Sequence, residues 1–314
     1  MKNPALRLTE KKWGVFTHYL YESICSPASP QNRGVGRIAW SDAVDMFDVE
    51  RVAYSLHRMN AGYYFITVQQ GTEYLIAPNE TFNKIAGTKA GECCAVRDLP
   101  MELAHALEKY GIDLCLYYTG VGPCTNPLIG ARFGYVCAEG DGTVTEDFCV
   151  KWGSVAAEYA ERYGSLVKAW WIDGMYDHLG YDDRLRGIIH GAIKKANPTA
   201  AIACNNGVKP TLTKVYSGEE FICGEENEFR LMPEGDLHGA VPHILAPLGY
   251  DKAEFIDWNG WAKTGCRHTA EYMRDYIRAF NRHGGAVSVD VFTDITGSFD
   301  TEQELLLRWV GENL

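Results

Sequence analysis

Hydrophobic and polar positions follow two alternating patterns along this chain. Short apolar runs rich in β-branched and aromatic residues predict strands, and stretches of helical periodicity, often opened by a capping residue, separate them. The predicted strands span residues 14–20, 63–69, 112–120, 168–173, 200–206, 219–227 and 286–292, with a weaker one at 254–260. The predicted helices span residues 48–62, 98–111, 148–164, 182–196, 269–285 and 300–314.

Strand–helix units in series imply parallel strands joined by helical crossovers. About eight such units in a chain of 314 residues predict an α/β fold, a (β/α)8 TIM-type barrel that forms one domain over residues 1–314. A doubly wound sheet is the alternative, but no GxGxxG motif follows the first strand to support it. The longer loops follow strands, which places them at the carboxyl face where barrel active sites lie; they span residues 21–46, 71–97, 120–147 and 228–253.

The composition is that of an ordinary globular protein, and its charge narrows the partners. The net charge is −11, from 30 basic and 41 acidic residues, and no cluster of Lys and Arg stands out. This balance argues against nucleic acid or an anionic membrane as a partner. The opening residues lack the apolar run of a secretory signal, no stretch has the length of a membrane span, and the ten cysteines include no CxxC pair. We therefore expect a cytoplasmic protein, for which a homo-oligomer is compatible with the sequence.

The stretch "KAWWIDG", residues 168–174, ends a predicted strand on an acid. Side chains of a strand alternate between its two faces, so Trp171 and Asp173 share one face while Trp170 takes the other. An acid before Gly174 also suits the opening of a turn, and the spacing alone leaves both interpretations open.

Acids, amides and aromatic residues recur at the ends of the predicted strands. These residues are His18, Gln69, Gln70, Tyr117, Tyr118, Asp173, Asn205, Asn206, Glu225, Glu226, Glu228, Asp290 and Asp294. Aromatic faces together with amides and carboxylates suit a polyhydroxylated ligand, and two acids in one cleft suit glycoside hydrolysis. The first strand has no HxH pair and the chain has no HExxH motif, so we expect neither a metal nor another cofactor.

At these positions the chain resembles the catalytic barrel of glycoside hydrolase family 29, the retaining α-L-fucosidases. "KKWGVFTHY" (11–19) is similar to the family's K-F-G-x-F-x-H-W, and "AWWIDG" (169–174) to its W-F-D-G. The segments 46–71, 97–120 and 284–299 follow the family's further motifs in the same order. The resemblance implies that Asp173 is the nucleophile and that His18 binds the sugar.

The chain also departs from the family pattern. Gln69 and Gln70 stand where two histidines contact fucose in the family, and Asp290 replaces an amide. Pro242 and His243 stand where the family has a tryptophan–glutamate pair, and the β-sandwich that usually follows the barrel is not seen.

The resemblance and the strand ends together predict a retaining glycoside hydrolase acting on a carbohydrate. The acid/base is expected among three glutamates: Glu226 and Glu228 share a face of the predicted strand, and Glu225 stays open because a bulge beyond Gly224 would break the alternation. The expected substrate-binding residues are His18, Gln69, Gln70, Tyr118, Trp171, His243 and Asp290. The second hypothesis is a sugar-binding barrel that has lost catalysis, which the Gln69–Gln70 replacement favours and the retained Asp173 disfavours.

Overall fold

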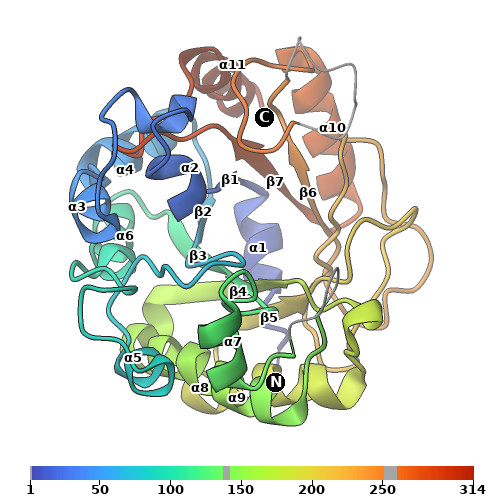
Figure 1. Ribbon diagram of the computed structural model, residues 1–314. Helices are drawn as coiled ribbons and strands as arrows, with labels where there is room; N and C mark the ends of the chain where they lie inside the picture. Colours follow the sequence, from blue (N-terminus) through green and yellow to red (C-terminus); the bar gives the residue numbers. More distant parts are fainter. Residues whose placement is uncertain (1, 137–141, 251–259) are drawn as a thin grey trace.

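A curled parallel sheet forms the centre of the molecule (Figure 1). The computed structural model describes residues 2–136, 142–250 and 260–314. Within these residues the sheet has seven strands in the order β5-β4-β3-β2-β1-β7-β6, and all pairs are parallel. The strands are β1 (Trp13–Thr17), β2 (Tyr63–Thr67), β3 (Asp113–Thr119), β4 (Val167–Asp173), β5 (Ala201–Cys204), β6 (His243–Pro247) and β7 (Ala286–Val291). The predicted α/β class is confirmed, with seven strands in the described residues where the sequence predicts eight.

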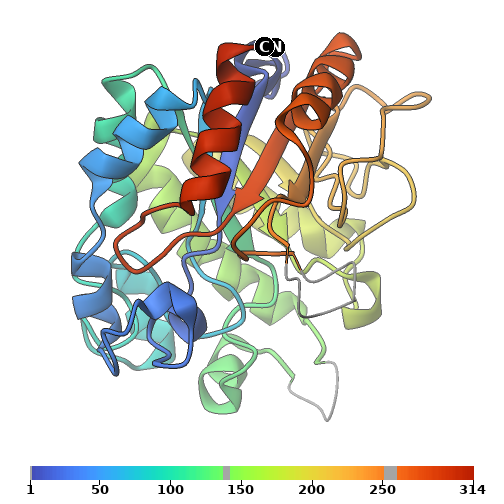
Figure 2. The same cartoon turned by 90° about the horizontal axis from the view of Figure 1, so that it is seen from above.

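Helices cover the outer face of the sheet, as two views at right angles show (Figures 1 and 2). The six predicted helices are present as α4 (Val49–Arg58), α6 (Leu99–Glu108), α8 (Glu146–Tyr163), α9 (Asp183–Ala196), α10 (Ala270–Arg282) and α11 (Thr301–Glu312). Asp48 caps α4 by accepting a hydrogen bond from the Arg51 N–H, as an N-terminal aspartate should. Shorter helices outside the predicted ones are α1 (Leu6–Lys11), α2 (Tyr21–Ile24), α3 (Trp40–Asp45), α5 (Glu80–Ala86) and α7 (Pro127–Phe133). The 3₁₀ turns are η1 (Pro30–Asn32), η2 (Gly164–Leu166) and η3 (Asp177–Leu179).

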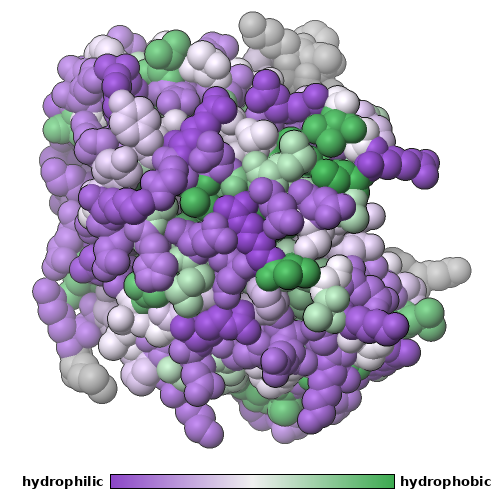
Figure 3. All heavy atoms as spheres, turned by 90° about the vertical axis from the view of Figure 1, so that its left-hand side faces the viewer, coloured by the Kyte–Doolittle hydropathy of each residue, from purple (hydrophilic) through white to green (hydrophobic). Residues whose placement is uncertain are grey.

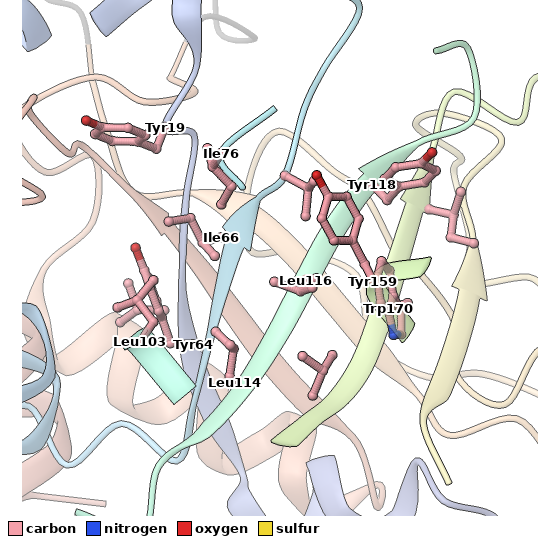
Figure 4. Packing of buried hydrophobic residues seen from close by; sticks show 14 of the residues in the cluster. Tyr19, Tyr64, Ile66, Ile76, Leu103, Leu114, Leu116, Tyr118, Tyr159 and Trp170 are labelled. Atoms are coloured by element: carbon pink, nitrogen blue, oxygen red, sulfur yellow. The ribbon is translucent and has the colours of Figure 1, made fainter. Parts of the chain in front are cut away.

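The alternation of side chains along each strand divides the core into two layers. Trp170 and Ile172 of β4 belong to the large cluster between sheet and helices, part of which is shown in Figure 4, whereas Trp171 belongs to the cluster inside the curl. The predicted split of this strand is therefore confirmed. Ala5 and Leu8, at the start of the chain, belong to the inner cluster. The helix α1 therefore packs against the inside of the curled sheet.

Residues 219–226 lie within the segment 219–227 that the sequence predicts as a strand, and they span the gap between the edge strands β5 and β6. The Glu220 N–H donates to the Ile202 carbonyl (3.0 Å), and the Glu226 N–H donates to the Leu245 carbonyl (3.0 Å). The segment forms isolated bridges and no continuous ladder. It therefore joins the two edges while keeping an irregular backbone.

Two further predictions concern a strand in a predicted loop and a predicted strand outside the described residues. The strand β6 lies inside the segment 228–253 that the sequence assigns to a loop. The sequence pattern misses it because the strand has five residues, shows no alternation of polar and apolar positions and ends at Pro247. The weaker predicted strand at 254–260 lies outside the described residues except for Gly260.

Hydrophilic residues predominate on the face shown in Figure 3, where hydrophobic residues stand in small separate groups. Exposed apolar side chains scattered in this way are normal for a globular protein. Among the described helices, none combines the length and the apolar character that crossing a bilayer would require.

Gly224 is the residue that permits the irregular path before Glu225. Its φ of +65° lies in the left-handed region, and a Cβ at this position would meet the His243 carbonyl oxygen at 1.9 Å. Only glycine fits both requirements at low cost.

We predict that Gly224→Ala lowers the melting temperature by several degrees more than Gly235→Ala. Gly235 has a similar φ of +71° but open space at its Cβ position, so the control measures the backbone strain of about 1 kcal/mol alone. The steric overlap at Gly224 should add roughly 1–3 kcal/mol of destabilisation. Thermal unfolding of both variants checks this, and equal shifts would show that the close approach to His243 is unimportant.

Candidate active site

A pocket of about 410 Å³ opens where the strands of the sheet end. Such a volume suits a small-molecule ligand, and the carboxyl edge of a parallel sheet is where active sites of barrel enzymes lie. Its polar and aromatic lining includes His18, Glu22, Gln70, Tyr117, Trp171, Asp173, Tyr176, Glu225 and Trp261.

Asp173 is held at the end of β4 by hydrogen bonds to both carboxylate oxygens. Tyr117 donates its hydroxyl to Oδ2 (2.6 Å), and the Asn205 amide donates to Oδ1 (2.6 Å). The side chain is 9% exposed, so it is shielded from most of the solvent. Gly174, with a φ of +70°, turns the chain away directly after it. Donors on both oxygens fix the orientation of the carboxylate.

Glu225 shares the same amide with Asp173. The Asn205 Nδ2 group also donates to Glu225 Oε2 (2.6 Å). Two contacts of this length to one nitrogen allow at most about 5 Å between the two carboxylate oxygens, close to the roughly 5–5.5 Å typical of a retaining pair. Burial, and then the negative charge of Asp173, raise the pKa of Glu225 to about 7.

Aromatic and imidazole groups hold the segment that carries Glu225. The Trp171 indole N–H donates to the Cys223 carbonyl (3.2 Å), and His243 Nδ1 bonds the same carbonyl (2.9 Å). Trp171 also stacks on Tyr117, with ring centroids 5.4 Å apart. Trp171, which forms the pocket wall beside Asp173, therefore also supports the backbone that carries Glu225.

Glu226 and Glu228, the two glutamates that strand alternation pairs, do not line this pocket. Glu226 accepts backbone hydrogen bonds from Arg230 (2.8 Å) and Leu231 (3.3 Å), which fold the following loop over it. Glu228 pairs with Arg230. Glu225 lies on the inner side of the segment with Phe221 and Cys223, whereas Ile222 faces the helices. Of the three glutamates that the sequence leaves open, Glu225 is the one that lines the pocket.

His18 lies in the pocket as the sequence predicts, and Asp290 supports it from behind. His18 Nδ1 bonds Asp290 Oδ1 (2.7 Å), and the His18 ring meets Trp261 edge to face at 5.7 Å. Burial disfavours the imidazolium form, but the Asp290 charge and hydrogen bond outweigh burial and raise the pKa of His18. Asp290 itself is fully buried.

Of the two glutamines that end β2, Gln70 lines the pocket and Gln69 does not. Gln69 turns its amide nitrogen to the carbonyls of Thr72 and Gly122, where it holds loop backbone.

The expectation that Tyr118 binds the substrate is also corrected, because this residue does not line the pocket. Its hydroxyl donates to the Trp152 carbonyl (3.0 Å), and its ring stacks on Trp152 at 4.9 Å, on the helix side of the sheet. Thr119 pairs with Asp173 in the sheet, so both side chains point to the same face. Tyr117 stands two residues before Thr119 and therefore shares this inner face, whereas Tyr118 takes the opposite one.

His243 is buried beneath the pocket rather than lining it. Its Nε2 bonds the Ser288 hydroxyl (2.8 Å), and burial lowers the pKa of His243 to about 4. The imidazole is therefore a neutral part of the core at ordinary pH, where it braces the backbone before Glu225.

Four residues of the pocket region have no role in the site that the sequence predicts: Asn205, Tyr117, Tyr176 and Trp261. Asn205 and Tyr117 stand at predicted strand ends, and strand parity relative to Asp173 is the signal that selects Tyr117 over Tyr118. In the part of the chain that the structure describes, no cluster of three or more His, Cys, Asp or Glu is placed to hold a metal ion.

The comparisons with known proteins identify the fold. An α-L-fucosidase of glycoside hydrolase family 29 from Bacteroides thetaiotaomicron, trapped as a covalent intermediate, superposes with a TM-score of 0.65 at 16% identity, covering 99% of this chain and 74% of that one. The endo-fucoidan hydrolase P5AFcnA of family 107 superposes with a TM-score of 0.70 at 13% identity, covering 98% of this chain and 92% of that one. This chain shares its fold with these glycoside hydrolases. No family model and no curated protein sequence matches it.

The resemblance that the sequence motifs indicate is thus confirmed for the fold over nearly the whole chain. At 13–16% identity this likeness shows the fold alone.

We predict that Asn205→Ala raises the pKa of Glu225 above its value of about 7. The amide stabilises the ionised carboxylate, and its loss leaves the repulsion from Asp173 uncompensated. A carboxyl ¹³C NMR titration, with the Glu225 signal assigned from Glu225→Gln, measures the change. Asn206→Ala is the matched control, because Asn206 bonds Asp177 outside the pair. An unchanged or lower pKa in Asn205→Ala would show that the shared amide does not link the two acids.

Proposed function

We propose that this protein is a retaining glycoside hydrolase of α-L-fucosidase type. The observation that carries the proposal is the pair of carboxylates, Asp173 and Glu225, that share the amide of Asn205 at one wall of the pocket. A spacing of at most about 5 Å leaves room for a sugar carbon between the acids but none for an intervening water, which is the arrangement of a double displacement.

Asp173 acts as the nucleophile. Its two hydrogen bonds, from Tyr117 and Asn205, hold it directed into the pocket. It attacks the anomeric carbon as the bond to the leaving oxygen breaks, and a glycosyl ester forms on Asp173.

Glu225 acts as the acid and then the base. With a pKa of about 7 it is protonated below neutrality and gives its proton to the leaving oxygen. The resulting carboxylate takes a proton from the water that attacks the anomeric carbon. The ester bond breaks, the sugar leaves with retained configuration, and both acids return to their first state.

The rest of the pocket suits a sugar. The Trp171 and Trp261 rings offer apolar faces, and His18 and Gln70 offer hydrogen bonds to hydroxyl groups. A fucoside is the proposed substrate because the family 29 neighbour with this fold was trapped in complex with 2-fluoro-fucosyl fluoride.

Replacing Asp173 by Asn tests the nucleophile. The amide keeps the size of the side chain but cannot form the ester, so kcat on an aryl α-L-fucoside should fall roughly 10³-fold or more. Asp177→Asn, on an exposed acid that bonds Arg186, is the matched control. Rates like those of the wild type in Asp173→Asn, with mass spectrometry excluding deamidation, would favour a sugar-binding barrel or a different nucleophile.

Comparing Glu225→Ala with Glu226→Ala tests the acid/base. Glu225→Ala should slow substrates with poor leaving groups by about 10²–10⁴-fold and activated aryl glycosides much less, and azide should restore turnover with retained configuration. In the wild type, activity on poor leaving groups should fall as pH rises through about 7, because Glu225 then loses its proton. This alkaline limb should vanish in Glu225→Ala.

Glu226→Ala should keep both the leaving-group dependence and the pH profile of the wild type, although loss of its backbone contacts should lower the melting temperature. The reverse pattern would assign the acid/base to Glu226.

A further inference from the structure

Asp290 is a fully buried carboxylate whose two oxygens serve two different elements of the pocket. Oδ1 bonds His18 Nδ1 (2.7 Å), directly after β1, and Oδ2 accepts the Ala262 N–H (2.7 Å) of the loop that follows β6. The neighbour of Ala262 is Trp261, whose ring stands against His18. One acid at the end of β7 therefore holds both a polar and an aromatic wall of the pocket.

This contact determines which atom of His18 a ligand meets. With Nδ1 engaged by Asp290, Nε2 is the ring nitrogen that remains for the pocket. If His18 is neutral with its proton on Nδ1, Nε2 can only accept a hydrogen bond; if His18 is an imidazolium, Nε2 donates a charged one.

The groups around His18 favour the charged form. The carboxylates of Asp290, Asp173 and Glu225 act on it from three elements, and Glu22 of α2 lies on the same pocket wall. The aromatic neighbours Tyr117 and Trp261 stand edge to face with the imidazole. Burial opposes the charge, and the acids, Asp290 foremost, outweigh it and raise the pKa of His18.

We propose that Asp290 is a positioning residue that favours the imidazolium form of His18, so that Nε2 presents a charged donor to an acceptor oxygen of the bound sugar. The sugar as ligand rests on the proposed function, whereas the charge of His18 does not. Asp290 acts through His18 and, by the Ala262 N–H, through the placement of Trp261.

The substitution Asp290→Asn isolates the charge from the contacts. The asparagine oxygen can still accept the Ala262 N–H, while its amide N–H can donate to His18 Nδ1. That arrangement requires a neutral imidazole protonated on Nε2, so the sugar contact persists without its charge. A charge-assisted hydrogen bond is roughly twice as strong as a neutral one.

The first test is an NMR titration of the histidine side chains, with His18 assigned among the nine histidines by loss of its signals in His18→Gln. The wild type should titrate at His18 above the unperturbed value of ~6.5. Asp290→Asn should lower this midpoint by at least about one pH unit. The matched control is Asp294→Asn, whose buried acid bonds Arg33 and the turn at 296–298, and it should leave the midpoint unchanged.

A wild-type midpoint at or below about 6.5 would overturn the proposal, and this arm needs no variant to fold. An equal fall in Asp290→Asn and Asp294→Asn would overturn it as well, since a general loosening of the core would then explain both.

The second test is kinetic. At pH 7, Asp290→Asn should raise KM for an aryl α-L-fucoside about five- to tenfold and change kcat less than about twofold, because the lost charge weakens ground-state and transition-state binding alike. A fall in kcat with unchanged KM would contradict the assigned role. If the wild type turns over no glycoside while His18 titrates as expected, the proposed function fails and the role of Asp290 in charging His18 stands.

Discussion

The structure of this site depends on one amide group placed between two acids. Asn205 donates to Asp173 and to Glu225 at 2.6 Å each, which brings two carboxylates together in a largely buried pocket. Two adjacent carboxylates cannot both ionise at little cost, so the proton stays on one of them near neutrality. Tyr117 donates only to Asp173, and the raised pKa belongs to Glu225. The surroundings therefore give two chemically similar side chains different roles.

This arrangement is built from a regular part and an irregular part of the fold. Asp173 ends a paired strand, where backbone register fixes its direction. Glu225 stands on a segment that bridges the edges of the sheet by isolated bonds, and its direction is set by Gly224 and by contacts to the Cys223 carbonyl from Trp171 and His243. The core beneath the pocket thus helps to set the spacing of the two carboxylates.

The sequence predicts the regular part well. Six helices, six of the seven strands and the faces of Trp170, Trp171 and Asp173 follow from periodicity and capping, because burial imposes those patterns on paired strands and packed helices. It leaves Glu225, Glu226 and Glu228 open, because the backbone departs from a repeating conformation at Gly224, just before them. The structure places Glu225 on the inner side with Phe221 and Cys223.

Other failures concern choices that only tertiary contacts make. Adjacent tyrosines at 117 and 118 are equally good strand residues, and their faces are decided by the pairing of β3 with β4. Likewise, nothing local distinguishes Asn205, which bridges the acids, from Asn206, which bonds Asp177. Gln69 and Gln70 divide in the same manner into a loop support and a pocket residue.

The central claim is that Asp173 becomes covalently attached to the sugar. Incubation with 2-fluoro-fucosyl fluoride, followed by intact-mass measurement and sequencing of the labelled peptide, tests it directly, since the fluorine slows hydrolysis of the ester. The account predicts one added fluorofucosyl group per chain, located on Asp173. A label on Glu225 or on another residue, or release of fluoride at a steady rate with the anomeric configuration inverted, would contradict it.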